Sequence, residues 1–149
     1  MPGISVSNIC VPFGGGGYDP RFKITIDTTK AGSANDTFVL PTTEAGYDAY
    51  VDWGDGGAEQ NITGTPGNVS HTYAAPGSYQ VKIRGTFPRI YFNNAGDKLK
   101  LMTIDNWGNV EWSSMQNAFY GCANPHNQEI PMNPVYKKLR PIRRFNDGW

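Results

Sequence analysis

Tyr50-Val-Asp-Trp-Gly-Asp-Gly-Gly57 is a short strand pattern that runs directly into a turn. Its first four residues alternate in the period of two that places successive side chains on opposite faces of a strand. The glycines supply positive φ, and the aspartate between them bonds its own backbone, so the chain must reverse direction here. This stretch therefore predicts one end of a β-hairpin.

A second strand and a corner follow this turn. The segment 77–85 alternates apolar and polar side chains, which is the pattern of a strand with one buried face and one solvent-exposed face. His71-Thr-Tyr73 stands just before the turn at Pro76-Gly77. In sandwich folds a tyrosine hydroxyl at such a corner ties the chain back to its own backbone, so we expect Tyr73 to be architectural.

These three pieces together resemble the polycystic-kidney-disease (PKD) type of immunoglobulin-like domain. The resemblance implies a β-sandwich that binds or assembles and does not catalyse. With 18 Gly, 11 Pro and 13% aromatic residues, turn formers and β formers dominate the composition, and 149 residues suit one domain. We therefore expect a mainly β protein: an immunoglobulin-like, PKD-like β-sandwich with one short C-terminal helix and extended N- and C-terminal arms.

Eight segments have the length and composition expected of strands, with alternation clearest in the longer ones. They are 22–27, 37–40, 49–53, 61–63, 69–73, 78–84, 89–92 and 98–104. The connections between them are short enough for hairpins or sandwich crossovers, so they are compatible with one β-sandwich spanning residues 22–124.

A second resemblance begins at the end of the first. Leu101-Met-Thr-Ile-Asp-Asn-Trp-Gly108, followed by Val110-Glu-Trp-Ser-Ser-Met-Gln-Asn-Ala-Phe-Tyr-Gly-Cys-Ala-Asn124, resembles one unit of the BspA-like leucine-rich repeats of bacterial surface and phage proteins. Segment 113–121 has a serine cap, apolar residues at i, i+3 and i+4, and a terminal glycine, so it predicts a short helix. A solenoid needs at least ~3 stacked units. A single unit, at about 99–124, must therefore cap the sandwich or lean on another chain.

The ends of the chain, 1–21 and 125–149, differ from its middle. The first is rich in glycine and proline and the second in proline, and neither has the apolar periodicity of a core. The tail 125–149 carries five basic and two acidic residues, whereas 22–124 carries seven basic and ten acidic residues, so charge is segregated along the chain. We expect both arms to gain order on neighbouring subunits, with packing against their own sandwich as the alternative.

Enzymatic activity is not expected. The glycine run at 14–17 lacks the Lys-Ser/Thr ending of a phosphate-binding loop. The two histidines, His71 and His126, are distant in sequence from the serines that could serve as nucleophiles. We therefore expect neither catalysis nor a cofactor.

Metal binding and a disulfide are secondary alternatives. Asp48, Asp52 and Asp55 are the candidates for a Ca²⁺ site, because this hard cation prefers oxygen ligands, but their spacing falls short of an EF-hand loop. Asp55 is explained more simply as a turn former, so no metal is expected. Cys10 and Cys122 are expected to be reduced apolar filler, with a single disulfide as the alternative.

These patterns favour a structural component of a phage virion, such as a capsid decoration protein, that assembles through its arms with other virion subunits and with copies of itself. The expected partner-binding residues are Tyr18, Arg21, Tyr136, Lys137, Lys138, Arg140, Arg143, Arg144, Phe145 and Trp149. The start of the chain has no secretory signal pattern, and no apolar span approaches the ~18 residues of a membrane helix. The expected location is therefore the virion, made in the host cytoplasm, with no membrane partner.

A cell-surface adhesion or carbohydrate-binding module is the alternative, with an extracellular or cell-surface location. Trp107, between Asn106 and Gly108 in an expected loop, is the candidate for an exposed ring that stacks on a host glycan, with core packing as its other role. Nucleic acid is not an expected partner, because the basic tail accompanies an acidic sandwich without a nucleic-acid motif.

Overall fold

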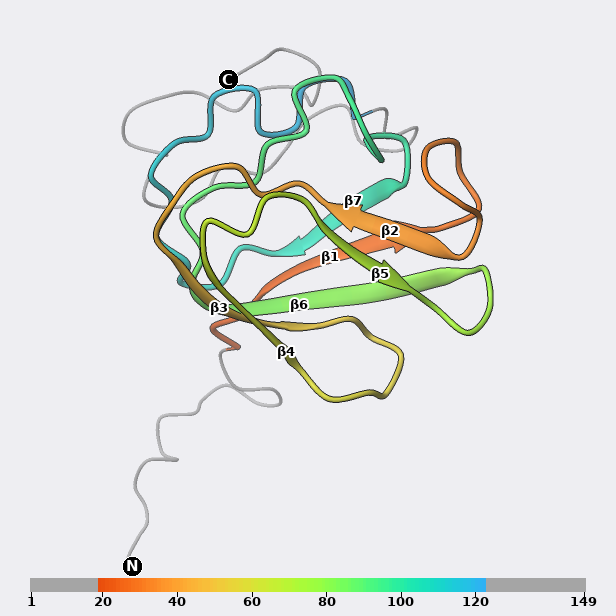
Figure 1. Cartoon of the computed structure of the whole chain (residues 1–149), viewed down its shortest axis with the longest axis horizontal. Coiled ribbons are helices and arrows are strands. Elements are labelled where there is room, and N and C mark those ends of the chain that lie inside the picture. The colour runs from red at the N-terminus through yellow and green to blue at the C-terminus, as the bar shows by residue number, and fades with distance from the viewer. Residues whose placement is uncertain (1–18, 123–149) are drawn as a thin grey trace, which may run out of the picture.

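The structure, a computed structural model, describes residues 19–122, which form seven strands and no helix (Figure 1). The strands are β1 (Phe22–Asp27), β2 (Thr37–Leu40), β3 (Tyr47–Asp52), β4 (Gln60–Gly64), β5 (Val69–Thr72), β6 (Ser78–Thr86) and β7 (Leu101–Asn106). They build a five-stranded sheet in the order β4-β3-β6-β1-β7 and a two-stranded sheet of β2 and β5. All pairings are antiparallel. Because strands are the regular elements and form two sheets, the described part is mainly β and sandwich-like.

The core lies between the two sheets, and the alternation of each strand explains why. Phe22, Ile24 and Ile26 of β1 are completely buried, whereas the residues between them are partly exposed. Phe38 and Leu40 of β2 are also completely buried and belong to the same apolar cluster. Burial of each such side chain stabilises the fold by about 1.5–3 kcal/mol, which makes this cluster the main source of stability.

The corner predicted at Tyr73 is present. The Tyr73 hydroxyl donates to the backbone carbonyl of Trp53 at 2.9 Å, and both residues are 2% exposed. The Tyr73 ring stacks on Tyr79 with ring centres 3.8 Å apart, and His71 stacks flat on Trp53 at 4.7 Å. The ends of β3 and β5 and the start of β6 therefore meet at one corner.

All expected strands but one are present; 22–27 and 37–40 have the predicted bounds, and the other five have shifted ends. The segment 89–92 was predicted to be a strand and is not one, so this prediction is wrong. Pro88 precedes this segment. The backbone amide of Tyr91 donates to the carbonyl of Pro41, and that of Phe92 donates to the carbonyl of Ala118, so the segment bonds two separate parts of the chain. A ladder needs one continuous partner strand, which this segment lacks.

The helix predicted over 113–121 is also wrong. The amides of Ala118 and Cys122 donate only to carbonyls three residues earlier, and Asn117 has a φ of +56°, which interrupts any helix. The carbonyls of 117, 118 and 120 instead accept the amides of 92–94. The apolar side chains are buried as their spacing suggested, but a run of turns buries them.

An aromatic cluster covers one end of the core. Trp112 contacts Phe22 edge to face at 4.9 Å, and Trp107 lies 5.6 Å from Phe22 and 6.2 Å from Phe119. Edge-to-face and tilted pairs of this kind add about 0.5–1.5 kcal/mol each beyond the area they bury. The segment after β7 is therefore packed against β1.

Gly54 and Gly56 form a matched pair in the turn after β3, because both have a φ of +86°. A Cβ on Gly54 would collide with the backbone carbonyl of Gln80 on β6, whereas one on Gly56 would meet nothing within 4 Å. We expect Gly56→Ala to lower the unfolding free energy by about 1–2 kcal/mol, the cost of a left-handed backbone. Gly54→Ala should lower it by about 1–3 kcal/mol more, because the strands must shift. Urea unfolding of both variants measures the difference, and equal losses would contradict the close approach of this turn to β6.

Candidate functional site

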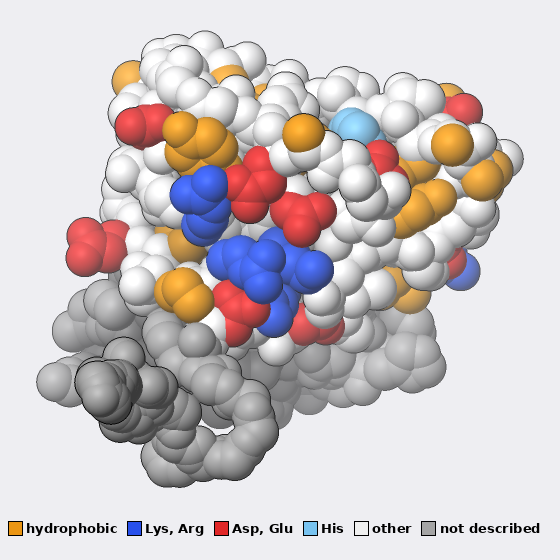
Figure 2. Space-filling model, turned by 90° about the horizontal axis from the view of Figure 1, so that it is seen from below, with side chains coloured by type: hydrophobic (Ala, Val, Ile, Leu, Met, Phe, Trp, Pro, Cys, Tyr) orange, Lys and Arg blue, Asp and Glu red, His pale blue; other side chains and the backbone are white. Residues whose placement is uncertain are grey.

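The outer face of the five-stranded sheet gathers charged side chains, with basic groups clustered and acidic groups around them (Figure 2). Arg84 binds Glu59 at 2.6 Å and lies over the Tyr50 ring, 4.2 Å from its centre. Lys82 lies 3.9 Å from Asp52. The basic groups on this face are thus neutralised by nearby carboxylates.

Every lysine and arginine that the structure describes has a partner, which is a carboxylate for all but Lys98 and Lys100. Within residues 19–122 the following have a hydrogen-bond or ion-pair partner: Arg21, Lys23, Lys30, Lys82, Arg84, Arg89, Lys98 and Lys100. Three exposed carboxylates of this part, Asp48, Asp105 and Glu111, have no lysine or arginine in ion-pair contact. With eight basic and eleven acidic residues, residues 19–122 carry a net negative charge.

Arg21 is the one expected partner-binding residue that the structure describes. Its guanidinium binds Asp19 through two hydrogen bonds of 2.8 and 3.0 Å, and Lys23 binds the same carboxylate at 2.7 Å. These bonds hold the pKa of Asp19 well below its usual range, the contact with Arg21 being the larger cause. The other expected partner-binding residues lie outside the described residues: Tyr18, Tyr136, Lys137, Lys138, Arg140, Arg143, Arg144, Phe145 and Trp149.

The three candidate metal ligands are spread over separate interactions. Asp52 accepts the Gly54 amide at 2.9 Å, and Asp55 accepts the Gly57 amide at 3.1 Å. Asp48 lies on β3, within 3.5 Å of an asparagine amide. Within residues 19–122, no three acidic, histidine or cysteine side chains gather as a metal site would require.

Trp107 is not the exposed ring that glycan stacking requires, because it is only 9% exposed and packs against Phe22 and Phe119. Its place in a loop suggested exposure, but the turns over 113–121 cover it. Cys122 is also buried, and burial raises the pKa of its thiol, which makes the thiolate scarce and the side chain a poor nucleophile.

A buried polar network, which sequence reasoning missed, fastens the loop between β1 and β2. The Asp97 carboxylate accepts the Val39 amide and both the amide and the hydroxyl of Ser33, each at 2.7 Å. Lys100 is completely buried, and its ammonium donates to the carbonyls of Ala34 and Thr37 at 2.7 Å. Buried charges need such partners, but alternation alone cannot reveal them.

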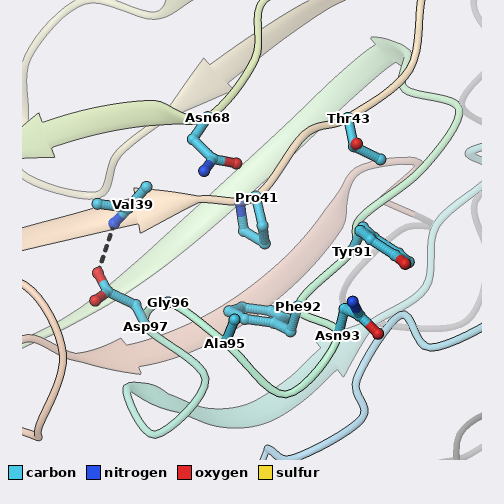
Figure 3. A pocket seen from close by; sticks show the side chains of 10 residues that line it. All are labelled: Val39, Pro41, Thr43, Asn68, Tyr91, Phe92, Asn93, Ala95, Gly96 and Asp97. Carbon is cyan, nitrogen blue, oxygen red and sulfur yellow. Dashed lines mark hydrogen bonds between the residues drawn. The ribbon is translucent and has the colours of Figure 1, made fainter.

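A pocket of about 230 Å³ lies between β2 and the segment 91–97 (Figure 3). Figure 3 shows the Phe92 ring beneath Pro41, with Tyr91 and Asn93 to one side and Asp97 to the other. We call this hollow the Tyr91 pocket. Sequence reasoning missed it because the expected strand at 89–92 would have placed Tyr91 in a regular sheet.

Asp55 and His71 form a hydrogen-bonded pair beside the Tyr73 corner, with a carboxylate oxygen 2.8 Å from Nε2. The hydrogen bond from His71, followed by that from the Gly57 amide, lowers the pKa of Asp55. The carboxylate therefore stabilises the fold above its unfolded-state pKa, and this contribution disappears as the pH falls through the lower folded-state pKa.

Asp55→Asn should accordingly flatten the decline in unfolding free energy below about pH 5. Asp48→Asn, which removes an exposed carboxylate of the same sheet, should flatten it less. Denaturant unfolding of both variants across the acidic range makes the comparison. A decline in Asp55→Asn as steep as in the parent protein would show that the His71 contact contributes no stability.

Residues 19–122 contain no candidate for a membrane-spanning helix. Comparisons with models of protein families, with curated proteins and with solved structures find no match to this chain. The function is therefore inferred from the sequence, the charge distribution and the geometry described above.

Proposed function

We propose that this chain is a non-catalytic structural component of a phage virion, built on an immunoglobulin-like sandwich of the PKD type. It assembles through its terminal segments with other subunits, including copies of itself. The two antiparallel sheets, the shared core and the Tyr73 corner are compatible with such a sandwich. The BspA-like unit then serves as the packed cover of one end of the sandwich.

The distribution of charge carries the assembly part of the proposal. Each lysine and arginine of residues 19–122 has a hydrogen-bond or ion-pair partner in this part of the chain, while the exposed carboxylates of Asp48, Asp105 and Glu111 have no lysine or arginine in ion-pair contact. The tail 125–149 holds five basic residues. Complementary charges on separate parts of a chain favour contact between the tail of one copy and the body of the next.

The composition of the tail supplies anchors besides charge. Phe145 and Trp149 follow Arg143 and Arg144 in the sequence, and aromatic and arginine side chains are the residues most enriched at energetic centres of interfaces. Arg21 contributes less to a partner than these arginines, because its guanidinium is already bound to Asp19. The tail is therefore the principal contact and the N-terminal segment the lesser one.

A separate observation supports glycan binding as a second function. The Tyr91 pocket combines an aromatic side chain with neutral polar groups, and residues of the described part line it. It would suit an accessory protein that also contacts a host surface.

Self-association of the full-length chain tests the assembly proposal. We expect it to be strong at low ionic strength and to weaken as the Debye length falls from about 30 Å at 0.01 M salt to about 8 Å at 0.15 M. The quintuple variant K137Q/K138Q/R140Q/R143Q/R144Q should be largely monomeric at low salt. Sedimentation velocity measures both proteins, and thermal unfolding checks that both are folded.

The double variant E129Q/D147N is the matched control, because it removes tail charges of the opposite sign. It should associate at least as strongly as the parent chain. A parent chain that stays monomeric at every salt concentration, or a quintuple variant that associates equally well, would refute assembly through the basic tail.

A further inference from the structure

The Tyr91 pocket has a pre-arranged aromatic wall. The Tyr91 amide donates to the Pro41 carbonyl at 3.1 Å, and the Arg89 guanidinium lies over the Tyr91 ring, 4.2 Å from its centre. Arg89 is itself held by Glu44 at 3.1 Å and by the Gln116 carbonyl at 2.9 Å. Both the backbone and one face of the ring are thus braced, which reduces the entropy lost when a ligand packs against it.

The rim of the pocket is equally constrained. Asn93 and Asn94 have φ values of +48° and +60°, and their amides donate to the carbonyls of Asn117 at 3.0 Å and Tyr120 at 2.7 Å. Left-handed residues other than glycine are uncommon, and such conformations cluster at functional sites. Here they turn the chain so that Tyr91, Phe92 and Asn93 all line one hollow.

The polar side chains of the pocket that are free to bond a ligand are neutral. Asn68 and Asn93 are exposed, and their side-chain amides have no hydrogen-bond partner among residues 19–122. Asp97, the only charged residue of 19–122 in the lining, already accepts three hydrogen bonds from Ser33 and Val39. The pocket therefore offers amides that both donate and accept, and no free charge.

Size and chemistry together define the ligand class. The volume of about 230 Å³ is below the roughly 300–1,000 Å³ of sites that hold drug-sized molecules, so one ring fits and a large ligand does not. An ionic ligand would find no unpaired charge, and a wholly apolar one would leave the amides of Asn68 and Asn93 without partners. A sugar ring has an apolar face for an aromatic side chain and hydroxyls for amides.

We propose that the Tyr91 pocket binds a single ring of a neutral saccharide, with Tyr91 packing on the sugar and Asn68 and Asn93 bonding its hydroxyls. This site is independent of the tail that carries the proposed assembly role. A single ring of roughly 12 non-hydrogen atoms would bind in the millimolar range. Useful affinity for a host glycan would then come from many copies on one particle.

The test uses the full-length chain and methyl glycosides of glucose, galactose, mannose and N-acetylglucosamine, followed by two-dimensional amide NMR. At least one glycoside should shift the resonances of 39–43 and 91–97 with millimolar affinity. Tyr91→Ala should weaken this binding at least tenfold. Asn68→Ala and Asn93→Gly should each weaken it by about two- to tenfold, the cost of one hydrogen bond, and glycine keeps the left-handed backbone at position 93.

Tyr120→Ala is the matched control, because Tyr120 is an exposed aromatic residue, 39% accessible, that does not line the pocket. It should leave glycoside binding unchanged, and Tyr91→Ala should leave self-association of the full-length chain unchanged. The proposal is overturned if none of the four glycosides shifts the pocket resonances, or if binding persists in Tyr91→Ala. It is also overturned if Tyr120→Ala abolishes binding while Tyr91→Ala does not.

Discussion

The buried hydrogen bond from the Tyr73 hydroxyl to the Trp53 carbonyl is the constraint on which the described structure most depends. It joins the end of β3 to the end of β5, and the stacking of Tyr73 on Tyr79 adds the start of β6. The two sheets meet at this corner, so it sets how their inner faces oppose each other. With the faces opposed, the apolar residues of β1, β2 and β6 form one core.

On the surface of residues 19–122, most basic side chains pair with carboxylates close to them. The carboxylates of Asp48, Asp105 and Glu111, by contrast, have no lysine or arginine in ion-pair contact. The tail 125–149 has a net positive charge, with five basic and two acidic residues. The proposed association uses complementary charge and aromatic anchors of the tail, while the residues proposed to bind a saccharide lie in the described part. The two proposed activities therefore use different parts of the chain and can be separated by substitution.

The strands and the Tyr73 corner could be predicted from the sequence because alternation and turn chemistry are local. The helix at 113–121 could not be judged in this way, since apolar spacing at i, i+3 and i+4 is satisfied equally by a run of turns. Segment 113–121 forms turns whose carbonyls accept the backbone amides of 92–94, and these amides are distant in sequence. The burial of Trp107 and the presence of the Tyr91 pocket could not be decided from the sequence, because both depend on contacts between segments that are distant in sequence.

The most direct measurement is the unfolding free energy of Tyr73→Phe beside that of Tyr79→Phe. Both substitutions remove one tyrosine hydroxyl, but that of Tyr73 is bonded to a buried carbonyl, whereas that of Tyr79 bonds the Ala75 carbonyl at an exposed position. Tyr73→Phe should cost about 1–3 kcal/mol, because the Trp53 carbonyl is left without a partner, and Tyr79→Phe about 0.5 kcal/mol or less. Equal and small losses would contradict the dependence of the fold on this corner.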